Sequence, residues 1–473
     1  MSRFGFALVF GCACSTLTMT GCSDAWNAGP MQYVESESLT KDVGKTNLFG
    51  KPVLQDKVRA ALVGLFGDSP QHIKVPVGSG LPAGGLYLGN HLQEGVGADA
   101  KIYTIYDARG VSSAMKVAVS EIGDARRQEG GYAIYRKNCL HCHGVSGAGD
   151  GPTAPFLYPL PRDYRKGIFK FTSTASGAKP DRSDLRRTIK NGLHGTSMPA
   201  FDALLVESEI EQVIDYVIFL SMRGETELAL IEEASISDEK DANALSDEIA
   251  KDVANNIFRK WKLAESQVFN PPTPRTPSSR ESILRGRDLF LGRTTEKLEC
   301  AGCHGPLARG DGPSFVSQDI FNEVVFGGNP SERQARLDAY TKQAEELKKE
   351  QKAATDKGDN ELAASLGEEA EKLVKIRVLW DQKPDDWGNP LRPANLNRGV
   401  YKGGRRPIDI FWRVAKGING AQMPAHYPSP LNEAKVWDVV NFVLALPYEP
   451  KLLKDVPAAP ATGPAVASSG LGP

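Results

Sequence analysis

The sequence predicts a mainly α-helical protein that contains two copies of one kind of domain. Two Cys-x-x-Cys-His motifs occur, at 139–143 and at 300–304. Similar segments follow them, CHGVSGAGDGPTA and later GLHGTSMPAF in the first copy, CHGPLARGDGPS and later GINGAQMPAH in the second. Each copy then ends in apolar residues at helical spacing. These are Ile210, Val213, Ile214, Val217 and Ile218 in the first copy, and Val436, Val439, Val440, Val443 and Leu444 in the second.

The overall composition is that of a globular protein and opposes a generally basic nucleic-acid binder. The chain has 473 residues, too many for one compact core, with 41% apolar and 24% charged residues. Lys and Arg total 57 and Asp and Glu total 58, which leaves a net charge near −1. After the first twenty residues, no apolar run approaches the roughly 18–20 residues needed to span a bilayer.

The first residues resemble an export signal of the lipoprotein type. Arg3 precedes an uncharged, mainly apolar stretch, and Met19-Thr20-Gly21-Cys22 is similar to a bacterial lipobox. This resemblance implies lipidation of Cys22, with the mature protein exported and anchored to the membrane on its periplasmic side. An ordinary cleaved signal and an uncleaved apolar anchor are the alternatives.

Changes of composition divide the chain into six segments. The second carries no chemical motif, but its stretch 52–66 has the pattern of an amphipathic helix. The fourth is acidic at first and ends in a proline-rich stretch that predicts an extended linker. The predicted segments are a signal peptide (1–21), an N-terminal accessory segment (22–125), the first motif-bearing domain (126–222), an acidic helical segment with the linker (223–278), the second motif-bearing domain (279–450) and a disordered tail (451–473).

The second motif-bearing domain contains an insertion at about 331–386. The inserted segment is rich in Glu, Lys and Ala and is interrupted once, at 356–360. This pattern predicts two antiparallel helices. Three interpretations of such a hairpin stay open from the sequence. It has no function of its own, it docks a partner, or it is a structural module in a larger assembly.

The Cys-x-x-Cys-His motifs have the spacing of covalent c-type haem attachment. Two cysteines three positions apart on a helical turn face one side, where they can bond the two vinyl groups of a haem while the histidine reaches the iron. Zinc would need about four ligands, a dithiol would not explain the repeated histidine, and disulfides within the motifs would close very small loops. The sequence therefore predicts two haem c groups, with zinc and dithiol sites as alternatives. The predicted residues are Cys139, Cys142 and His143 in the first copy, and Cys300, Cys303 and His304 in the second.

One methionine in each copy is the predicted second axial ligand of the iron. The repeat aligns Met198 with Met423, and each is followed by Pro-Ala. A proline can stiffen the loop that presents the sulfur atom, whereas a core methionine in a turn is the alternative. Met222 is expected to pack in the core. His194 and His426 occupy non-equivalent positions in the two copies, which argues against both as ligands.

Together these features resemble the class I cytochrome c family. The resemblance rests on Gly131 and Tyr135 before the first motif, Gly286 and Phe290 before the second, the Met-Pro loops and the closing helices. It implies small all-helical domains that wrap a haem, with the first and last helices crossing near these glycines. The expected fold is thus two tandem class I cytochrome c-like helical domains, with a helical-hairpin insertion in the second and an N-terminal accessory segment.

The predicted iron ligands favour electron transfer rather than catalysis. Histidine with methionine raises the potential of a haem, and six-coordinate iron leaves no open position for a substrate. The expected protein is a dihaem carrier, or a subunit of an oxidoreductase complex, that passes single electrons between respiratory partners. The expected partners are a quinol-oxidising complex, a dehydrogenase or a terminal oxidase. The alternative is a dihaem enzyme, peroxidase-like or oxidising a small inorganic substrate, with one open haem.

Two basic stretches lie between the haem motifs and the Met-Pro loops. The stretch 162–190 holds nine basic and three acidic residues, and 392–416 holds seven basic and one acidic. Both predict a rim that steers acidic partners. Pairing with haem propionates, or simple solvation of the surface, are the alternatives.

Overall fold

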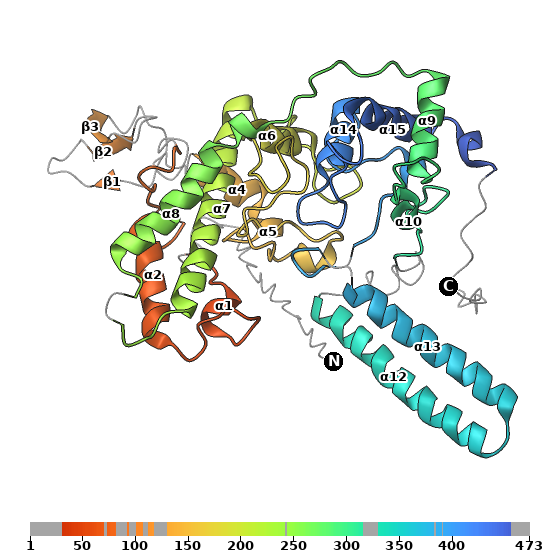
Figure 1. The fold of residues 1–473 in the computed structure, drawn as a ribbon. Helices are drawn as coiled ribbons and strands as arrows, with labels where there is room; N and C mark the ends of the chain where they lie inside the picture. The colour runs from red at the N-terminus through yellow and green to blue at the C-terminus, as the bar shows by residue number, and fades with distance from the viewer. Residues whose placement is uncertain are drawn as a thin grey trace, which may run out of the picture.

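The computed structural model describes residues 31–70, 73–81, 92–93, 101–106, 112–117, 130–241, 244–315, 330–382, 385–389 and 391–455. This part of the chain is mainly helical, as predicted, and forms two lobes with one projecting helical hairpin (Figure 1). None of the helices described is both long and apolar enough to cross a membrane. The predicted signal peptide and Cys22 lie outside the described residues.

The first lobe is built around one long helix, α7 (Glu207–Ser235). The first half of α7 carries the predicted apolar stripe and packs against α4 (Gly131–Asn138). The second half packs against α2 (Pro52–Phe66), whose bounds match the predicted helix, and against α8 (Asp247–Lys262). At this junction the ring centroid of Phe66 lies 5.7 Å from that of Phe219. The lobe therefore has one continuous hydrophobic core.

The predicted boundary after residue 222 falls inside α7 and is wrong. The helix continues because its apolar stripe continues, with Leu230 and Ile231 both buried. Met222 is buried in the core, as predicted. The accessory segment and the acidic segment consequently share a core with the first motif-bearing domain, instead of forming separate units.

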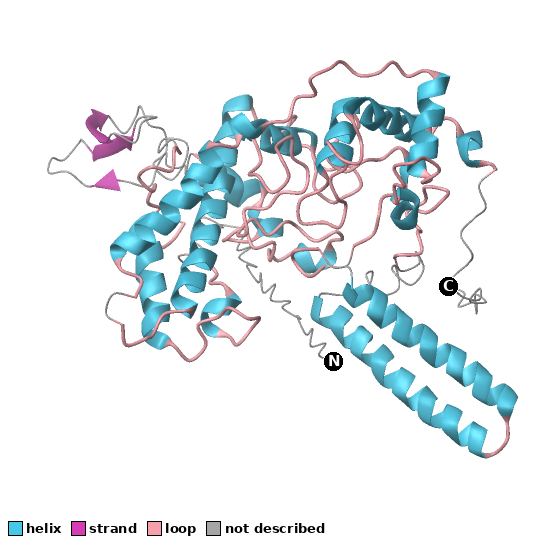
Figure 2. Cartoon of the chain, in the orientation of Figure 1, coloured by secondary structure: helices cyan, strands magenta, loops and turns pink. Residues whose placement is uncertain are grey.

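A small antiparallel sheet in the accessory segment was not expected from the sequence (Figure 2). Its strands are β1 (Leu92–Gln93), β2 (Lys101–Tyr106) and β3 (Ser112–Val117), with β2 in the middle. The sequence of β2 is rich in isoleucine and tyrosine, which favour strands. A single helical turn, α1 (Glu37–Thr40), precedes α2 in the same segment.

The second lobe is formed by α9 (Arg280–Phe290), α14 (Pro407–Lys416) and α15 (Glu433–Ala445). Helix α15 crosses α9 and also packs against α14. It begins after Asn432, whose side chain accepts a hydrogen bond of 3.0 Å from the backbone N–H of Lys435. This cap satisfies one of the N–H groups that have no partner within the first turn of the helix.

The predicted start of the disordered tail, at residue 451, is too early in the chain. Residues 450–453 form a 3-10 helix, η5 (Pro450–Leu453), and its two leucines are buried in the second core. Burial of these two apolar side chains favours the ordered turn. The rest of the predicted tail, 456–473, lies outside the described residues.

The insertion forms a helical hairpin, as predicted. Helices α12 (Pro330–Asp356) and α13 (Asn360–Gln382) lie side by side and extend away from the two lobes (Figure 1). The chain reverses direction at Gly358, which has a φ of +79°. Ala344, Leu373 and Ile376 form the small apolar core between the two helices.

The predicted linker contacts both lobes. The backbone N–H of Phe269 donates to Ser173 O at 2.9 Å in the first lobe. Farther along, the Arg275 guanidinium donates to Asn441 Oδ1 on α15 at 2.6 Å. The 3-10 turn η3 (Glu265–Gln267) precedes this stretch. The linker is therefore extended, as expected, but it is held along its length by hydrogen bonds.

Candidate functional site

A close helix crossing opens each motif-bearing domain. A Cβ atom on Gly131 would lie 2.2 Å from Gln212 O on α7, and one on Gly286 would lie 2.0 Å from Asp438 O on α15. Only glycine allows this approach, because real Cβ contacts are longer. Beside the crossings, the Tyr135 and Tyr216 rings lie 5.1 Å apart and the Phe290 and Phe442 rings 5.4 Å apart. The crossings expected near the two glycines are present.

The two Cys-x-x-Cys-His motifs adopt the same conformation. The first lies on α5 (Leu140–His143) and its N-cap Cys139, and the second on α10 (Cys300–His304). In the first motif, the backbone N–H of His143 donates to Cys139 O at 2.9 Å, which closes one helical turn. Two thiols and one imidazole are therefore brought together on a single turn in each domain.

The loops that follow the motifs have matching backbone contacts. The N–H of Gly149 donates to His143 O at 2.9 Å, and the N–H of Gly310 donates to His304 O at 2.8 Å. A Cβ atom on Gly149 would lie 2.5 Å from Pro161 O, and one on Gly310 would lie 2.4 Å from Pro393 O. The repeated glycines in this segment thus fill the same steric role in both domains. The loop of the first domain also contains a 3-10 turn, η2 (Ala154–Phe156).

Both motif histidines are oriented by a backbone carbonyl. Nδ1 of His143 lies 3.1 Å from Arg162 O, and Nδ1 of His304 lies 3.1 Å from Ala394 O. A carbonyl can only accept, so Nδ1 carries the proton and Nε2 is left free to bind a metal. Burial lowers the pKa of His143 to about 4 and also lowers the pKa of His304. Both rings are therefore neutral at pH 7, which is the form that binds iron.

The two predicted methionine ligands occupy equivalent loops. The first loop follows α6 (Arg182–Asn191), and the second follows α14. The N–H of Leu193 donates to Met198 O at 3.2 Å, and the N–H of Ile418 donates to Met423 O at 3.1 Å. Both methionines are half-buried. His194, by contrast, is exposed, and His426 lies in the loop just before a turn, where its backbone N–H donates to Val414 O.

The cysteines do not have the properties of a reactive dithiol. Burial, and then the neighbouring cysteine, raises the pKa of the Cys139 thiol to about 12 and that of Cys300 to about 11. Catalytic dithiols depend on a lowered thiol pKa. Within the described ranges, no three His, Cys, Asp or Glu side chains are grouped so that they could hold a metal ion. The raised pKa values of Cys139 and Cys300 oppose the dithiol alternative.

Many basic side chains of the first predicted rim, 162–190, form ion pairs inside the protein. Lys170 of the first domain pairs with Asp385 of the second at 2.9 Å. Other basic side chains of these stretches are paired within their own domains, some with adjacent carboxylates and some with carboxylates of another helix. These pairs are Arg165–Asp163, Arg182–Asp215, Arg186–Glu211, Lys190–Glu207 and Arg406–Asp409. The structure therefore gives little support to a free basic surface over the first stretch, 162–190.

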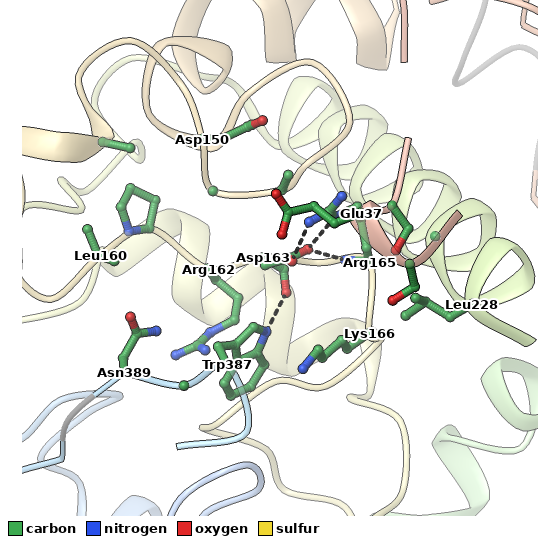
Figure 3. A pocket seen from close by; sticks show the side chains of 18 of the residues that line it. Glu37, Asp150, Leu160, Arg162, Asp163, Arg165, Lys166, Leu228, Trp387 and Asn389 are labelled. Carbon is green, nitrogen blue, oxygen red and sulfur yellow. Dashed lines mark hydrogen bonds and ion pairs between the residues drawn. The ribbon is translucent and has the colours of Figure 1, made fainter. Parts of the chain in front are cut away.

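Sequence reasoning missed Trp387, which contacts the segment whose carbonyl orients His143. Its indole Nε1–H donates to Asp163 O at 3.2 Å, and the Arg162 guanidinium carbon lies 3.7 Å from its ring centroid (Figure 3). A cavity of about 800 Å³ opens next to these residues, between α1, α7 and the root of α12. No sequence signal identifies Trp387, because its partners are more than 200 residues away in the chain.

A family model and a known protein match parts of this chain in sequence. Residues 126–217 match the family model described as cytochrome c oxidase, cbb3-type, subunit III. Cytochrome c55X of Paracoccus denitrificans (strain Pd 1222) is 29% identical over 101 residues, which cover 21% of this chain and 82% of that protein. These comparisons support a c-type cytochrome. A chain of the Kuenenia stuttgartiensis reducing HAO-like protein complex is 22% identical, with a TM-score of 0.38, and the match covers 66% of this chain and 93% of that one.

A c-type cytochrome binds haem covalently and transfers electrons. The family match covers the first Cys-x-x-Cys-His motif and the methionine loop up to the first half of α7. It ends before the second motif-bearing domain. For the second motif-bearing domain, the similarity to a c-type cytochrome rests on backbone contacts equivalent to those found in the first domain.

Proposed function

We propose that this protein is a dihaem c-type cytochrome that transfers single electrons through two similar sites. Each haem would be attached to both cysteines of one motif, with the motif histidine and the methionine of the later loop as axial ligands. The proposed residues are Cys139, Cys142, His143 and Met198 at the first site, and Cys300, Cys303, His304 and Met423 at the second. The supporting observation is that both histidines hold Nδ1 at 3.1 Å from a backbone carbonyl oxygen in equivalent loops.

The donor atoms of both sites fit a haem. The imidazoles are neutral with Nε2 free, and the half-buried thioethers are neutral donors, so no charge has to be neutralised by binding. Arg413, on α14, has a buried Nε atom with no hydrogen-bond partner among the described residues. A haem carboxylate is the kind of group that would satisfy it.

Within this proposal, the residues of the chain act by fixing the ligands and not by moving protons. A haem with histidine and methionine ligands supplies a one-electron couple at raised potential. The Arg162 and Ala394 carbonyls fix the histidine rings and increase their basicity. The loop hydrogen bonds hold the methionine segments in place. Rigid ligation of both oxidation states keeps the structural change on electron transfer small.

The first test is the haem content of the full chain matured in a host that attaches haem c. Two covalent haems per chain, both low-spin and with the weak ferric absorption band of methionine–iron ligation, are expected. Replacing Cys300 and Cys303 by alanine should reduce the content to one haem, as should the matched change of Cys139 and Cys142. One haem per wild-type chain, or a high-spin iron, would contradict the proposal and favour an enzyme with an open haem.

We further propose that the protein is exported and anchored at Cys22, where it exchanges electrons with membrane-associated respiratory partners. The lipobox-like segment supports the anchor, since acyl chains contribute ~0.8 kcal/mol of membrane affinity per buried CH₂. Cys22→Ser should move the protein from the membrane to the soluble periplasmic fraction and should abolish incorporation of labelled fatty acid. Cys14→Ser, within the predicted signal, is the matched control and should change neither. Incorporation of the label by Cys22→Ser would contradict the anchor.

A further inference from the structure

The chain that returns from the helical hairpin is bonded to the proximal side of the first site. This returning segment, 385–389, belongs to the second domain by sequence. Its indole at Trp387 donates from Nε1 to Asp163 O at 3.2 Å, and the Arg162 guanidinium carbon lies 3.7 Å from the centre of the ring (Figure 3). One side chain of the second domain therefore contacts two consecutive residues of the first.

These two contacts flank the peptide group that orients His143. The carbonyl of Arg162 accepts the hydrogen bond from Nδ1 of His143 at 3.1 Å. The same peptide is held by the Arg162 side chain stacked on the indole and by the next carbonyl, that of Asp163, bonded to Nε1. A cation–π contact and a hydrogen bond each contribute about 1 kcal/mol. Trp387 thus restrains the acceptor of the axial histidine from both sides.

Trp387 is itself held in place by a buried carboxylate. Asp385, whose side chain is 4% exposed, pairs with Lys170 of the first domain at 2.9 Å. Its other oxygen accepts from the backbone N–H groups of Trp387 at 3.1 Å and Asn389 at 2.9 Å. The indole is therefore preorganised by the turn that carries it, and its position does not depend on the cavity beside it.

The indole also packs against the methionine loop of the second site. A Cβ atom on Gly420 would lie 2.5 Å from Cζ3 of Trp387, so the bare backbone of Gly420 packs directly on the ring. Gly420 lies three residues before Met423, and its carbonyl accepts from the N–H of Asp386 at 3.2 Å. The Trp387 side chain thus contacts the loop of one proposed axial ligand, Met423. It also contacts the segment whose carbonyl accepts the hydrogen bond of another, His143.

We propose that Trp387 is a positioning residue that couples the two haem sites and makes them unequal. Its indole N–H stabilises the hydrogen bond of His143, and its ring supports the Met423 loop. At the second site, Ala394 occupies the place of Arg162 and has only a methyl group, so it cannot make the same stack on an indole. The inference rests on the proposed function, because it acts on the potentials of the two proposed haems.

The test compares Trp387→Phe with Trp412→Phe by redox titration of the matured full chain. Trp412 is a matched control: its indole donates to Phe269 O at 2.7 Å and Arg187 of the first domain lies 5.3 Å from its ring, but it touches no acceptor of an axial histidine. Titrations are repeated with Met423→Ala, which shifts the second haem and leaves the first to be read alone.

Trp387→Phe keeps an aromatic ring at this position but removes the indole N–H. The hydrogen bond of His143 therefore weakens, and its imidazole becomes less basic. The equilibrium of the first haem should shift about three- to tenfold toward the ferrous form. At 59 mV per tenfold for one electron, its reduction potential rises by ~30 to ~60 mV. Trp387→Ala also removes the ring from Gly420 and should shift the second haem as well. Trp412→Phe should leave the first potential unchanged.

Two results would overturn the inference: an unchanged first potential in Trp387→Phe, or an equal shift in Trp412→Phe. The EPR g-values of the first ferric haem give an independent readout, since they follow the strength of the histidine ligand field and should change only in the Trp387 variants. Absence of two haems in the wild-type chain would instead overturn the proposed function itself, so the two failures are distinguishable.

Discussion

Lys170 of the first motif-bearing domain and Asp385 of the second form an ion pair with a separation of 2.9 Å. Both side chains are largely buried, with exposed fractions of 16% and 4%. Such a pair fixes the orientation of its two partners, because moving either one leaves a buried charge uncompensated. The two lobes are therefore joined by a specific polar contact as well as by the linker.

Asp385→Asn should weaken the union of the two lobes. It removes the carboxylate that is paired with the buried Lys170 ammonium, which we expect to cost about 3 kcal/mol. Urea unfolding and limited proteolysis of the linker would measure the change. Asp338→Asn is the control, because Asp338 pairs with Arg377 at 2.8 Å but is 61% exposed, and such pairs contribute under about 1 kcal/mol. Equal effects of the two substitutions would contradict the prediction.

Glycine substitutions should have opposite effects at two kinds of helical site. Gly131→Ala places a methyl group 2.2 Å from Gln212 O, so α4 and α7 must separate, and we expect a loss of about 1–3 kcal/mol. Gly286→Ala should behave likewise at the second crossing. Gly64→Ala, on α2 with nothing within 4 Å of the new methyl group, should stabilise by about 0.5–1 kcal/mol. Thermal unfolding of the three variants would check both signs.

Met423→Ala should lower the potential of one haem. Loss of the sulfur ligand favours the ferric state, and we expect a fall on the order of 0.1–0.3 V, within the ~0.8 V that axial ligands span. The opened iron should also acquire peroxidase activity. Met222→Ala is the contrasting control, because Met222 is buried in the core and should cost about 2–4 kcal/mol of stability with both potentials unchanged. A wild-type potential in Met423→Ala would exclude Met423 as a ligand.

Tyr401 should contribute to stability at neutral pH and lose that contribution in alkali. Its hydroxyl donates to Val443 O at 2.9 Å, and burial raises its pKa from the usual 10 to about 12. Because the folded pKa is above the unfolded one, the contribution is complete below pH 10 and disappears as the pH rises through 12.

The measurement is the stability difference between the wild type and Tyr401→Phe as a function of pH. We expect about 1–2 kcal/mol near pH 8, falling steadily above pH 10. Tyr448→Phe removes a phenol that is 69% exposed and controls for general effects of the substitution. A difference that stays constant from pH 8 to pH 12 would contradict the assignment.

Features with a local signature could be predicted from the sequence. The bounds of α2, the hairpin broken at Gly358 and the cap at Asn432 follow from periodicity and turn residues that are adjacent in the chain. The glycine crossings could be predicted because the repeat shows the same residues twice. Gly131 and Gly286 then fulfil one steric requirement in two places.

Features that depend on distant partners could not be predicted in this way. The extension of α7 depends on packing against α2 and α8, and the acidic composition after residue 222 suggested a boundary instead. The neutralisation of Arg182 and Arg186 depends on carboxylates of another helix. Trp387 reaches the first site only because the insertion returns across it, and no spacing in the sequence encodes that contact.

The hairpin of the second domain is a long arm whose chain returns through a turn that contacts both motif-bearing domains. Helix α12 has 27 residues and is therefore ~40 Å long at 1.5 Å per residue. The turn, at 385–389, forms an ion pair with Lys170 of the first domain and a backbone hydrogen bond with Gly420 of the second. On the proposed function, a partner that binds the distant tip of the hairpin would act through this turn on both proposed haem sites without contacting either one.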